Sequence, residues 1–185
     1  MKKQIGYLAL ALTECGVSLD AGLSESELQH IETTLAFTFP PDLHAFLCHS
    51  LPTSRGFPLW RQPDLQEVQS RLAWPADGIC FDIEYNAFWE ADWGPKPSNL
   101  PDALSLARAK IAAFPVLIPI YSHRYIPASP PEGGNPVYSV HQTDIIYYGL
   151  DLTDYLCAEF RIPRPPGYLR PAAPKQIVFW GDLVS

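Results

Sequence analysis

Features that are scarce in this 185-residue sequence exclude several classes of protein. The four cysteines lie far apart and form no Cys-x-x-Cys pair, which argues against a zinc knuckle and a thioredoxin-type redox motif; they are Cys15, Cys48, Cys80 and Cys157. No apolar stretch approaches the ~20 residues that a membrane-spanning helix needs. Lys and Arg number 13 against 20 Asp and Glu, and the net charge of −7 is opposite to that of a nucleic-acid binder. We therefore expect no direct contact with nucleic acid or with a membrane.

The first residues superficially resemble a signal peptide, because Lys2 and Lys3 precede an apolar run at 5–12. Residues 13–15 supply no small-residue cleavage site, however. The apolar residues recur at helical spacing, which predicts an amphipathic helix that ends near Gly16. We accordingly expect a cytoplasmic protein with reduced cysteines.

Proline and aromatic residues are abundant. The 20 prolines, together with 5 Trp, 9 Tyr and 9 Phe, argue against a bundle of long helices, because proline interrupts helices and aromatics favour pleated surfaces. The 47% hydrophobic and 18% charged residues are typical of a globular chain of this length, which suffices for one domain with a real core.

Helix signals recur along the chain. Ser24 and Glu27 form a capping box in front of an apolar stripe, which predicts a helix over 24–35, and Pro41 opens a helix that ends near Ser50. Helical spacing predicts three further helices, at 64–72, 102–111 and 152–160.

Strand signals differ in period. A short strand is predicted at 57–60, and 78–84 alternates apolar with polar residues, which predicts a half-buried strand with an acidic face. Two β-rich runs, 117–126 and 137–148, flank a connection dense in Pro, Gly and Asn, and together they predict a hairpin.

Symmetric pairing of that hairpin would place His123 opposite His141. The other face would then carry Arg124 and Asp144, which could form a charge-assisted pair that fixes the register. Asn135 is expected to stabilise the connecting turn by bonding nearby backbone. A register slip of one residue would exchange the two faces, so the pairing is a prediction.

These elements predict a single α+β domain over residues 1–160, with helices packed on a curved, mainly antiparallel sheet. Residues 161–185 are rich in proline and basic side chains, which predicts a semi-extended strap. Its apolar residues 177–180 would pack back on the body or on a partner.

Catalytic and metal signals are weak. No Gly-x-Ser-x-Gly elbow occurs, and a nucleophile would have to be Ser139 or Cys80 with His123 or His141, which ordinary polar positions explain better. His123 and His141 lack a third metal ligand.

The pair His44 and His49 lies five residues apart and shares no helix face. No Gly-rich phosphate loop leads into a helix. We expect no enzyme, no cofactor and no metal.

Two surfaces could bind a partner. Residues 77–92 hold five acids and no basic residue, with aromatics nearby, which favours a protein-binding surface made of Asp82, Glu84, Trp89, Glu90, Asp92 and Trp93. One alternative is a glycosidase or sugar-binding cleft that combines these carboxylates with Trp60, Trp89 and Trp93 as stacking platforms. The other is that Phe88, Trp89 and Trp93 are core residues under a loop. A small-ligand pocket on the sheet face would consist of Trp60, Tyr121, His123, Tyr125, Ser139 and His141.

Several strings, taken in order and spacing, resemble the SUKH superfamily of immunity and cell-wall-regulator proteins. They are Phe39-Pro40-Pro41-Asp42 to Phe46-Leu47, Leu51-Pro52, Phe57 to Trp60-Arg61, Gly78 to Phe81-Asp82 with Phe88-Trp89, Trp93-Gly94, Leu117-Ile118-Pro119-Ile120, His123-Arg124-Tyr125-Ile126-Pro127 and Gly134-Asn135-Pro136-Val137 to Asp144. The resemblance covers residues 22–160. It implies helices packed on a curved sheet and a role in binding proteins, such as basic toxin domains or components of cell-wall synthesis, and it supplies no catalytic residues. An acidic single domain suits the capture of a basic protein.

Overall fold

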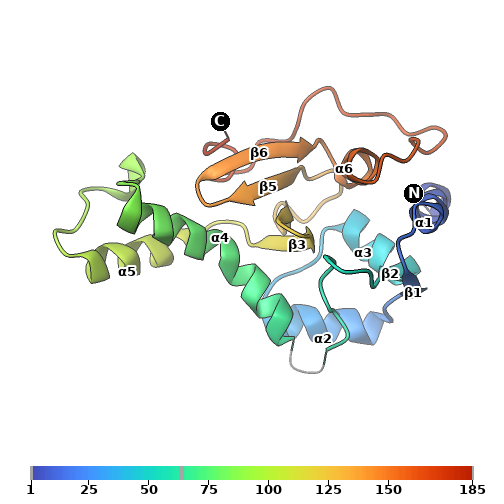
Figure 1. Ribbon diagram of the computed structural model, residues 1–185, viewed down its shortest axis with the longest axis horizontal. Coiled ribbons are helices and arrows are strands. Elements are labelled where there is room, and N and C mark those ends of the chain that lie inside the picture. The colour runs from blue at the N-terminus through green and yellow to red at the C-terminus, as the bar shows by residue number, and fades with distance from the viewer. Residues whose placement is uncertain (1, 63–64, 185) are drawn as a thin grey trace.

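The computed structural model describes residues 2–62 and 65–184, which fold as an α+β structure with two antiparallel sheets (Figure 1). The elements are α1 Lys2–Glu14, β1 Leu19–Ala21, α2 Glu25–Leu35, α3 Pro41–His49, β2 Ser50–Pro52, α4 Gln66–Tyr85, the 3₁₀ turn η1 Ala91–Trp93, α5 Leu100–Ile111, β3 Leu117–Tyr121, β4 Arg124–Pro127, β5 Val137–His141, β6 Asp144–Gly149 and α6 Leu152–Glu159. None of the described helices is both long and apolar enough to cross a membrane.

The first three helices follow their sequence signals. In α2, the Ser24 side chain accepts from the backbone N–H of Glu27, while the Glu27 carboxylate accepts from the N–H of Ser24, so the predicted capping box is confirmed. Helix α3 begins at Pro41, where the missing N–H of proline costs nothing. The predictions for α1, α5 and α6 are confirmed within one or two residues.

Helix α4 corrects two predictions. It runs through the 78–84 segment that was expected to be a strand, and it extends the helix expected at 64–72, whose residue 64 lies outside the described residues. Ile79 and Ile83 are buried one helical turn apart, whereas Phe81 is 45% exposed. Two of the three alternating apolar residues therefore satisfy helical as well as strand spacing. The strand predicted at 57–60 is also wrong, because these residues form a bend, irregular backbone and the start of a turn.

The four-stranded sheet has the order β3-β4-β5-β6. Each β-rich run is itself a hairpin, so the prediction of one long hairpin is wrong: the chain reverses at Ser122 and again at Gln142, where φ is 50° and 58°. The two runs still meet, because β4 pairs with β5. Arg124 lies opposite Ser139 there, and the Val140 N–H donates to His123 O at 3.0 Å, so His123 does not face His141.

The buried side chains form two core clusters. The first gathers residues of α1, α2, α3 and α6 and sheet residues such as Ile118 and Ile126, with Leu65 and Val68 at the start of α4. The second lies among the later part of α4, α5, the sheet and the C-terminal residues, and includes Ile79 and Ile83. Figure 1 shows α4 leading away from the helices near the N-terminus, with α5 packed back along it as a projecting arm.

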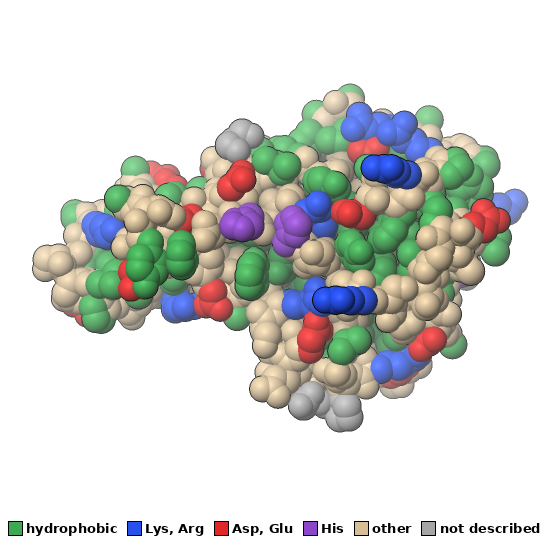
Figure 2. Space-filling model, viewed as in Figure 1, with side chains coloured by type: hydrophobic (Ala, Val, Ile, Leu, Met, Phe, Trp, Pro, Cys, Tyr) green, Lys and Arg blue, Asp and Glu red, His purple; other side chains and the backbone are tan. Residues whose placement is uncertain are grey.

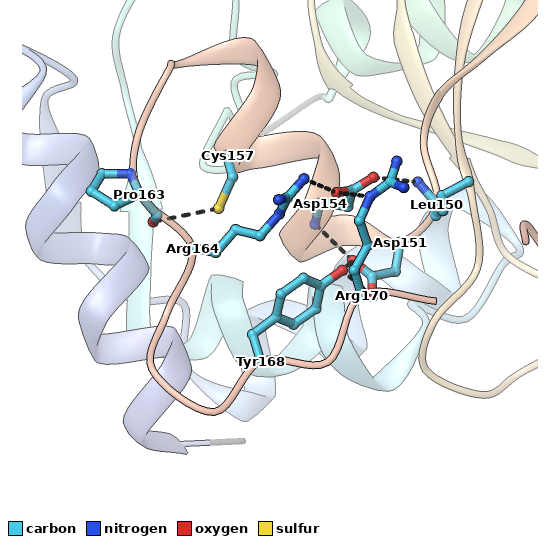
Figure 3. A network of polar contacts seen from close by, with 8 residues as sticks. All are labelled: Leu150, Asp151, Asp154, Cys157, Pro163, Arg164, Tyr168 and Arg170. Atoms are coloured by element: carbon cyan, nitrogen blue, oxygen red, sulfur yellow. Dashed lines mark hydrogen bonds and ion pairs between the residues drawn. The ribbon is translucent and has the colours of Figure 1, made fainter. Parts of the chain in front are cut away.

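The segment after α6 returns along the body and is tied to α6 by charged side chains (Figure 3). The Asp154 carboxylate is buried and accepts from Arg170 Nε at 2.7 Å and from Arg164 Nη2 at 3.1 Å, while the Tyr168 hydroxyl donates to Asp151. Further on, Ile177, Phe179 and Trp180 are buried in the second core cluster. Val184 forms a parallel bridge to Ile145 of β6.

Candidate functional site

The predicted acidic surface is divided between the core and the exterior. Asp82 and Trp93 are only 4% and 5% exposed, so the interpretation of these two residues as partner-binding is wrong. Glu84 and Asp92 are exposed, while Trp89 and Glu90 are half-buried. Trp93 packs its ring edge-on against Trp89 and stacks on Phe179, which makes it a core residue beneath the loop.

Asp82 holds α4 to the β5–β6 turn. Its carboxylate accepts from the Thr143 backbone N–H at 2.9 Å, from the Thr143 hydroxyl at 2.6 Å and from the Asn86 amide at 2.6 Å. Burial alone would raise the pKa of this carboxyl, but the Thr143 and Asn86 hydrogen bonds outweigh burial and hold the pKa below its ordinary value. Gly78 permits the same contact, because a Cβ there would lie 2.8 Å from the Cα of Gln142.

Helix α4 exposes three large aromatic side chains that the sequence analysis did not bring together. Trp74, Phe81 and Tyr85 are 52%, 45% and 64% exposed. Separations of seven and four residues place all three on one helix face, and the Phe81 and Tyr85 rings lie 4.7 Å apart. We call these residues the aromatic stripe. Figure 2 shows hydrophobic side chains gathered on the part of the surface formed by α4 and α5.

Carboxylates without an ion-pair partner among the described residues lie on α4 and on the turn that contacts it. Glu84 is the neighbour of Tyr85 on α4, and Asp144 belongs to the β5–β6 turn that contacts α4. Within residues 2–62 and 65–184, neither forms an ion pair with a Lys or Arg side chain, and the same holds for Glu90 and Asp92. The Tyr85 end of the stripe is therefore both apolar and acidic, whereas Trp74 at its other end lies beside Arg55 and Arg71.

A cleft of about 530 Å³ opens beside the aromatic stripe, between the loop at Arg55, the start of α4 and the β3–β4 turn. Of the six residues predicted to form a ligand pocket, His123 and Tyr125 line this cleft. The tryptophan that lines it is Trp74, in place of the predicted Trp60.

The other four predicted pocket residues lie elsewhere, so their assignment to one pocket is wrong. Trp60 is buried in the first core cluster against Phe39, and Tyr121 packs on Phe57 and Phe160. Ser139 accepts from Arg124, and His141 is exposed outside the cleft. Trp60 lies outside the sheet and Tyr121 ends β3, before the turn, while the β4–β5 register places Ser139 opposite Arg124.

The cleft carries a surplus of positive charge. Arg71 is held by an ion pair with Glu67 and donates to Gly56 O at 3.0 Å, while the exposed Arg55 has no ion pair with the described residues. The pKa of His123 is lowered, first by burial and then by the charge of Arg124, so its ring is neutral near pH 7.

Arg124 and Asp144 do not form the predicted pair. Arg124 bonds to Glu159 at 3.1 Å and to Ser139 at 2.8 Å, and its guanidinium lies 3.8 Å from the centre of the Tyr148 ring. Asp144 is exposed at the start of β6, with β5 between it and β4.

Asn135 is fully buried and holds a turn. Its amide donates to the carbonyl oxygens of Pro127 and Pro130, at 3.0 and 2.9 Å, so it bonds nearby backbone as its sequence context indicates.

The two candidate nucleophiles lie on different elements. Cys80 is buried on α4, and burial raises the pKa of its thiol, which disfavours the reactive thiolate. Ser139 on β5 accepts a hydrogen bond from Arg124.

Comparisons of the chain with protein-family models, with curated proteins and with solved structures found no match. The resemblance to the SUKH superfamily therefore stays a prediction.

Proposed function

We propose that this protein is a non-catalytic binding domain that captures a basic protein through the aromatic stripe of α4. The single observation that carries the proposal is the exposure of Trp74, Phe81 and Tyr85 along one helix face. Large aromatic side chains are enriched among the residues that contribute most to the binding energy of protein interfaces. Three of them exposed together on one helix form an apolar patch of the kind that marks an interaction site.

The charges around the stripe indicate the kind of partner. Glu84 adjoins Tyr85, and Asp144 lies on the turn that contacts α4. Neither forms an ion pair with a described Lys or Arg side chain, and the net charge of the chain is −7. Carboxylates at the rim of an interface speed encounter with a basic protein and select against acidic ones. The resemblance to the SUKH superfamily supports a toxin domain or a component of cell-wall synthesis as the partner. We also propose a cytoplasmic location, where the four cysteines would stay reduced.

The test is affinity capture with the wild-type chain and matched surface variants. Phe81→Ser with Tyr85→Ser removes two aromatic rings, and Glu84→Lys reverses one rim charge. The controls are Leu169→Ser, which changes a residue that is 88% exposed elsewhere, and Glu14→Lys, which changes an exposed acid at the end of α1. Circular dichroism checks that each variant is folded.

We expect the wild-type chain to capture a basic protein in a one-to-one complex. Both stripe variants should fail to capture this protein, and both control variants should still capture it. Binding of that protein should weaken as salt is raised, since salt screens charges at the rim. Retention of the partner by the stripe variants would show that another surface binds it. A captured acidic protein would contradict the charge argument.

A second candidate function is the binding of a small anionic ligand in the cleft, favoured by the placement of His123, Tyr125 and Trp74 around about 530 Å³. The surplus charge of Arg55 and Arg71 over Glu67 favours an anion, and Trp74 offers a stacking surface. Titrations with aromatic carboxylates and with neutral oligosaccharides, followed by tryptophan fluorescence, test this function. A response to the carboxylates that disappears in Trp74→Phe and weakens in Arg55→Gln would support it, and no response to either class would exclude these ligands.

A further inference from the structure

A cluster of three possible metal ligands lies where α2 meets α3. Glu25 is the first residue of α2, and His44 and Cys48 are one turn apart on α3. One ligand atom from each residue lies within 4.8 Å of the others. His49 is five residues from His44 and shares no helix face with it, whereas Cys48 is four residues away and does share one.

Two of the three separations within the cluster are close to those around a tetrahedral ion. Cys48 Sγ lies 3.5 Å from Glu25 Oε1 and 3.7 Å from His44 Nδ1. Bonds of about 2.0 to 2.3 Å from zinc to O, N and S imply distances of roughly 3.3 to 3.8 Å between ligand atoms at tetrahedral angles. His44 contacts Glu25 through its other ring nitrogen, with Nε2 3.3 Å from Glu25 Oε2. A single ion would bind one of the two nitrogens, and rotation of the exposed Glu25 side chain would bring the three ligand atoms around it.

The backbone holds the two helices in this arrangement. The Leu23 N–H donates to Leu47 O at 2.8 Å, just before α2 begins. Gly22 allows the close approach, because a Cβ there would lie 1.9 Å from Cys48 O. Arg61 donates to the carbonyl oxygens of Ala21 and Gly22, each at 2.9 Å. The position of Glu25 over α3 is therefore fixed by main-chain contacts, and the three ligands do not depend on a metal ion to meet.

We propose that Glu25, His44 and Cys48 bind one divalent transition-metal ion, with Zn²⁺ as the best match. One thiolate, one imidazole and one carboxylate suit a borderline-soft ion and do not suit Mg²⁺ or Ca²⁺, which require oxygen ligands. Three protein ligands leave a fourth position for water or for a group from a partner. Glu25 is largely exposed, with 81% of its side-chain surface accessible, so an ion can enter from solvent.

The test is titration of the purified full-length chain with Zn²⁺ by calorimetry and with Co²⁺ by absorption spectroscopy. We expect one ion per chain, and for Co²⁺ a thiolate charge-transfer band with the intense visible bands of tetrahedral coordination. Cys48→Ser should abolish the charge-transfer band. Glu25→Gln, on an exposed side chain, should weaken Zn²⁺ binding by about tenfold or more, since loss of even an outer-shell partner costs that much.

Matched controls separate this site from other ligands in the chain. Cys15→Ser removes an exposed thiol at the end of α1, and His123→Gln removes a histidine of the cleft; both should leave Zn²⁺ binding unchanged. Zn²⁺ should also slow alkylation of Cys48 without slowing that of Cys15, as mass spectrometry of labelled peptides would show. Absence of one-to-one binding, or equal loss of affinity in the control variants, would overturn the proposal.

Discussion

The Tyr125 hydroxyl donates a 3.0 Å hydrogen bond to the backbone carbonyl oxygen of Arg71. Arg71 lies four residues before Pro75, which sits inside α4 and has no N–H to complete the helical hydrogen bond to that carbonyl. A side chain of β4 thus supplies the donor that proline removes. The helix crosses the sheet at the point where its own hydrogen bonding is interrupted.

Replacing Tyr125 by Phe removes the hydroxyl that donates to the Arg71 carbonyl oxygen. Tyr125 is only 1% exposed, so water cannot easily replace this donor. Loss of one partner of a buried hydrogen bond costs about 1 to 3 kcal/mol, and we expect a decrease of that size in the free energy of unfolding. Urea denaturation measures it. The contact also explains how Pro75 is accepted within a 20-residue helix.

The same substitution in a Pro75→Ala background provides the control. An alanine N–H at position 75 can donate to the Arg71 carbonyl, so Tyr125→Phe should then cost less than it does beside proline. Equal costs in the two backgrounds would show that the tyrosine hydroxyl does not substitute for the missing helical donor.

Asp82→Asn should destabilise the fold in a way that depends on pH. The pKa of Asp82 is lower in the folded chain than its ordinary value, so the ionised carboxylate stabilises the fold above pH ~4 and this contribution is lost as pH falls through the folded-state pKa. We expect a cost of about 2 kcal/mol at pH 7 that shrinks towards pH 3. Denaturation curves at several pH values measure this difference. Asp144→Asn, at an exposed position, should change stability by less than about 0.5 kcal/mol at either pH.

The contacts of Asp154 predict local loosening when its cations are removed. Arg164→Gln with Arg170→Gln leaves a carboxylate whose side chain is only 5% accessible without a basic partner. Amide hydrogen exchange of residues 163–172 should quicken, while the helical amides of α1 keep their protection. Arg161→Gln changes an exposed arginine that forms no ion pair with the described residues, and it should leave exchange unaltered. Unchanged exchange in the double variant would show that other contacts hold the segment.

Two glycine substitutions should have opposite effects. Gly22→Ala would place a Cβ 1.9 Å from the carbonyl oxygen of Cys48, so α2 must move from α3 and stability should fall by more than about 2 kcal/mol. Gly6→Ala adds a methyl group inside α1 at an ordinary 3.6 Å contact, and it should stabilise the chain by about 0.5 to 1 kcal/mol. Thermal denaturation of the two variants would reveal the contrast.

Local signals in the sequence predicted the elements that local interactions determine. The capping box of Ser24 and Glu27 defines the start of α2 without help from the rest of the chain. Helix α4 was divided in the prediction because Pro75 interrupts its pattern and because Ile79, Phe81 and Ile83 also fit a strand. The helix is selected because it buries Ile79 and Ile83 in the second core cluster. That burial depends on residues far away in the chain, so the local sequence pattern does not predict it.

The sheet turns and the site were less accessible to sequence reasoning. The chain reverses at Ser122 and Gln142 with positive φ, where the usual Gly or Asn signal is missing, so both turns were overlooked. His123 and Tyr125 were placed in a pocket, but its other walls come from Arg55 and Arg71, which a hairpin pattern cannot bring to the sheet. The aromatic stripe became visible only once residues 74–85 were known to be helical.

The course of α4 through the molecule bears on how the chain unfolds. Helix α4 supplies Val68 to the first core cluster and Ile79 to the second, and the sheet also contributes to both, so melting of either cluster would remove packing from elements that the other needs. We therefore expect the two clusters to behave as one cooperative unit. In scanning calorimetry the measured enthalpy should equal the van't Hoff enthalpy, with a single transition for the whole chain. Two transitions would mean that α4 breaks at Pro75 and lets the projecting arm melt by itself.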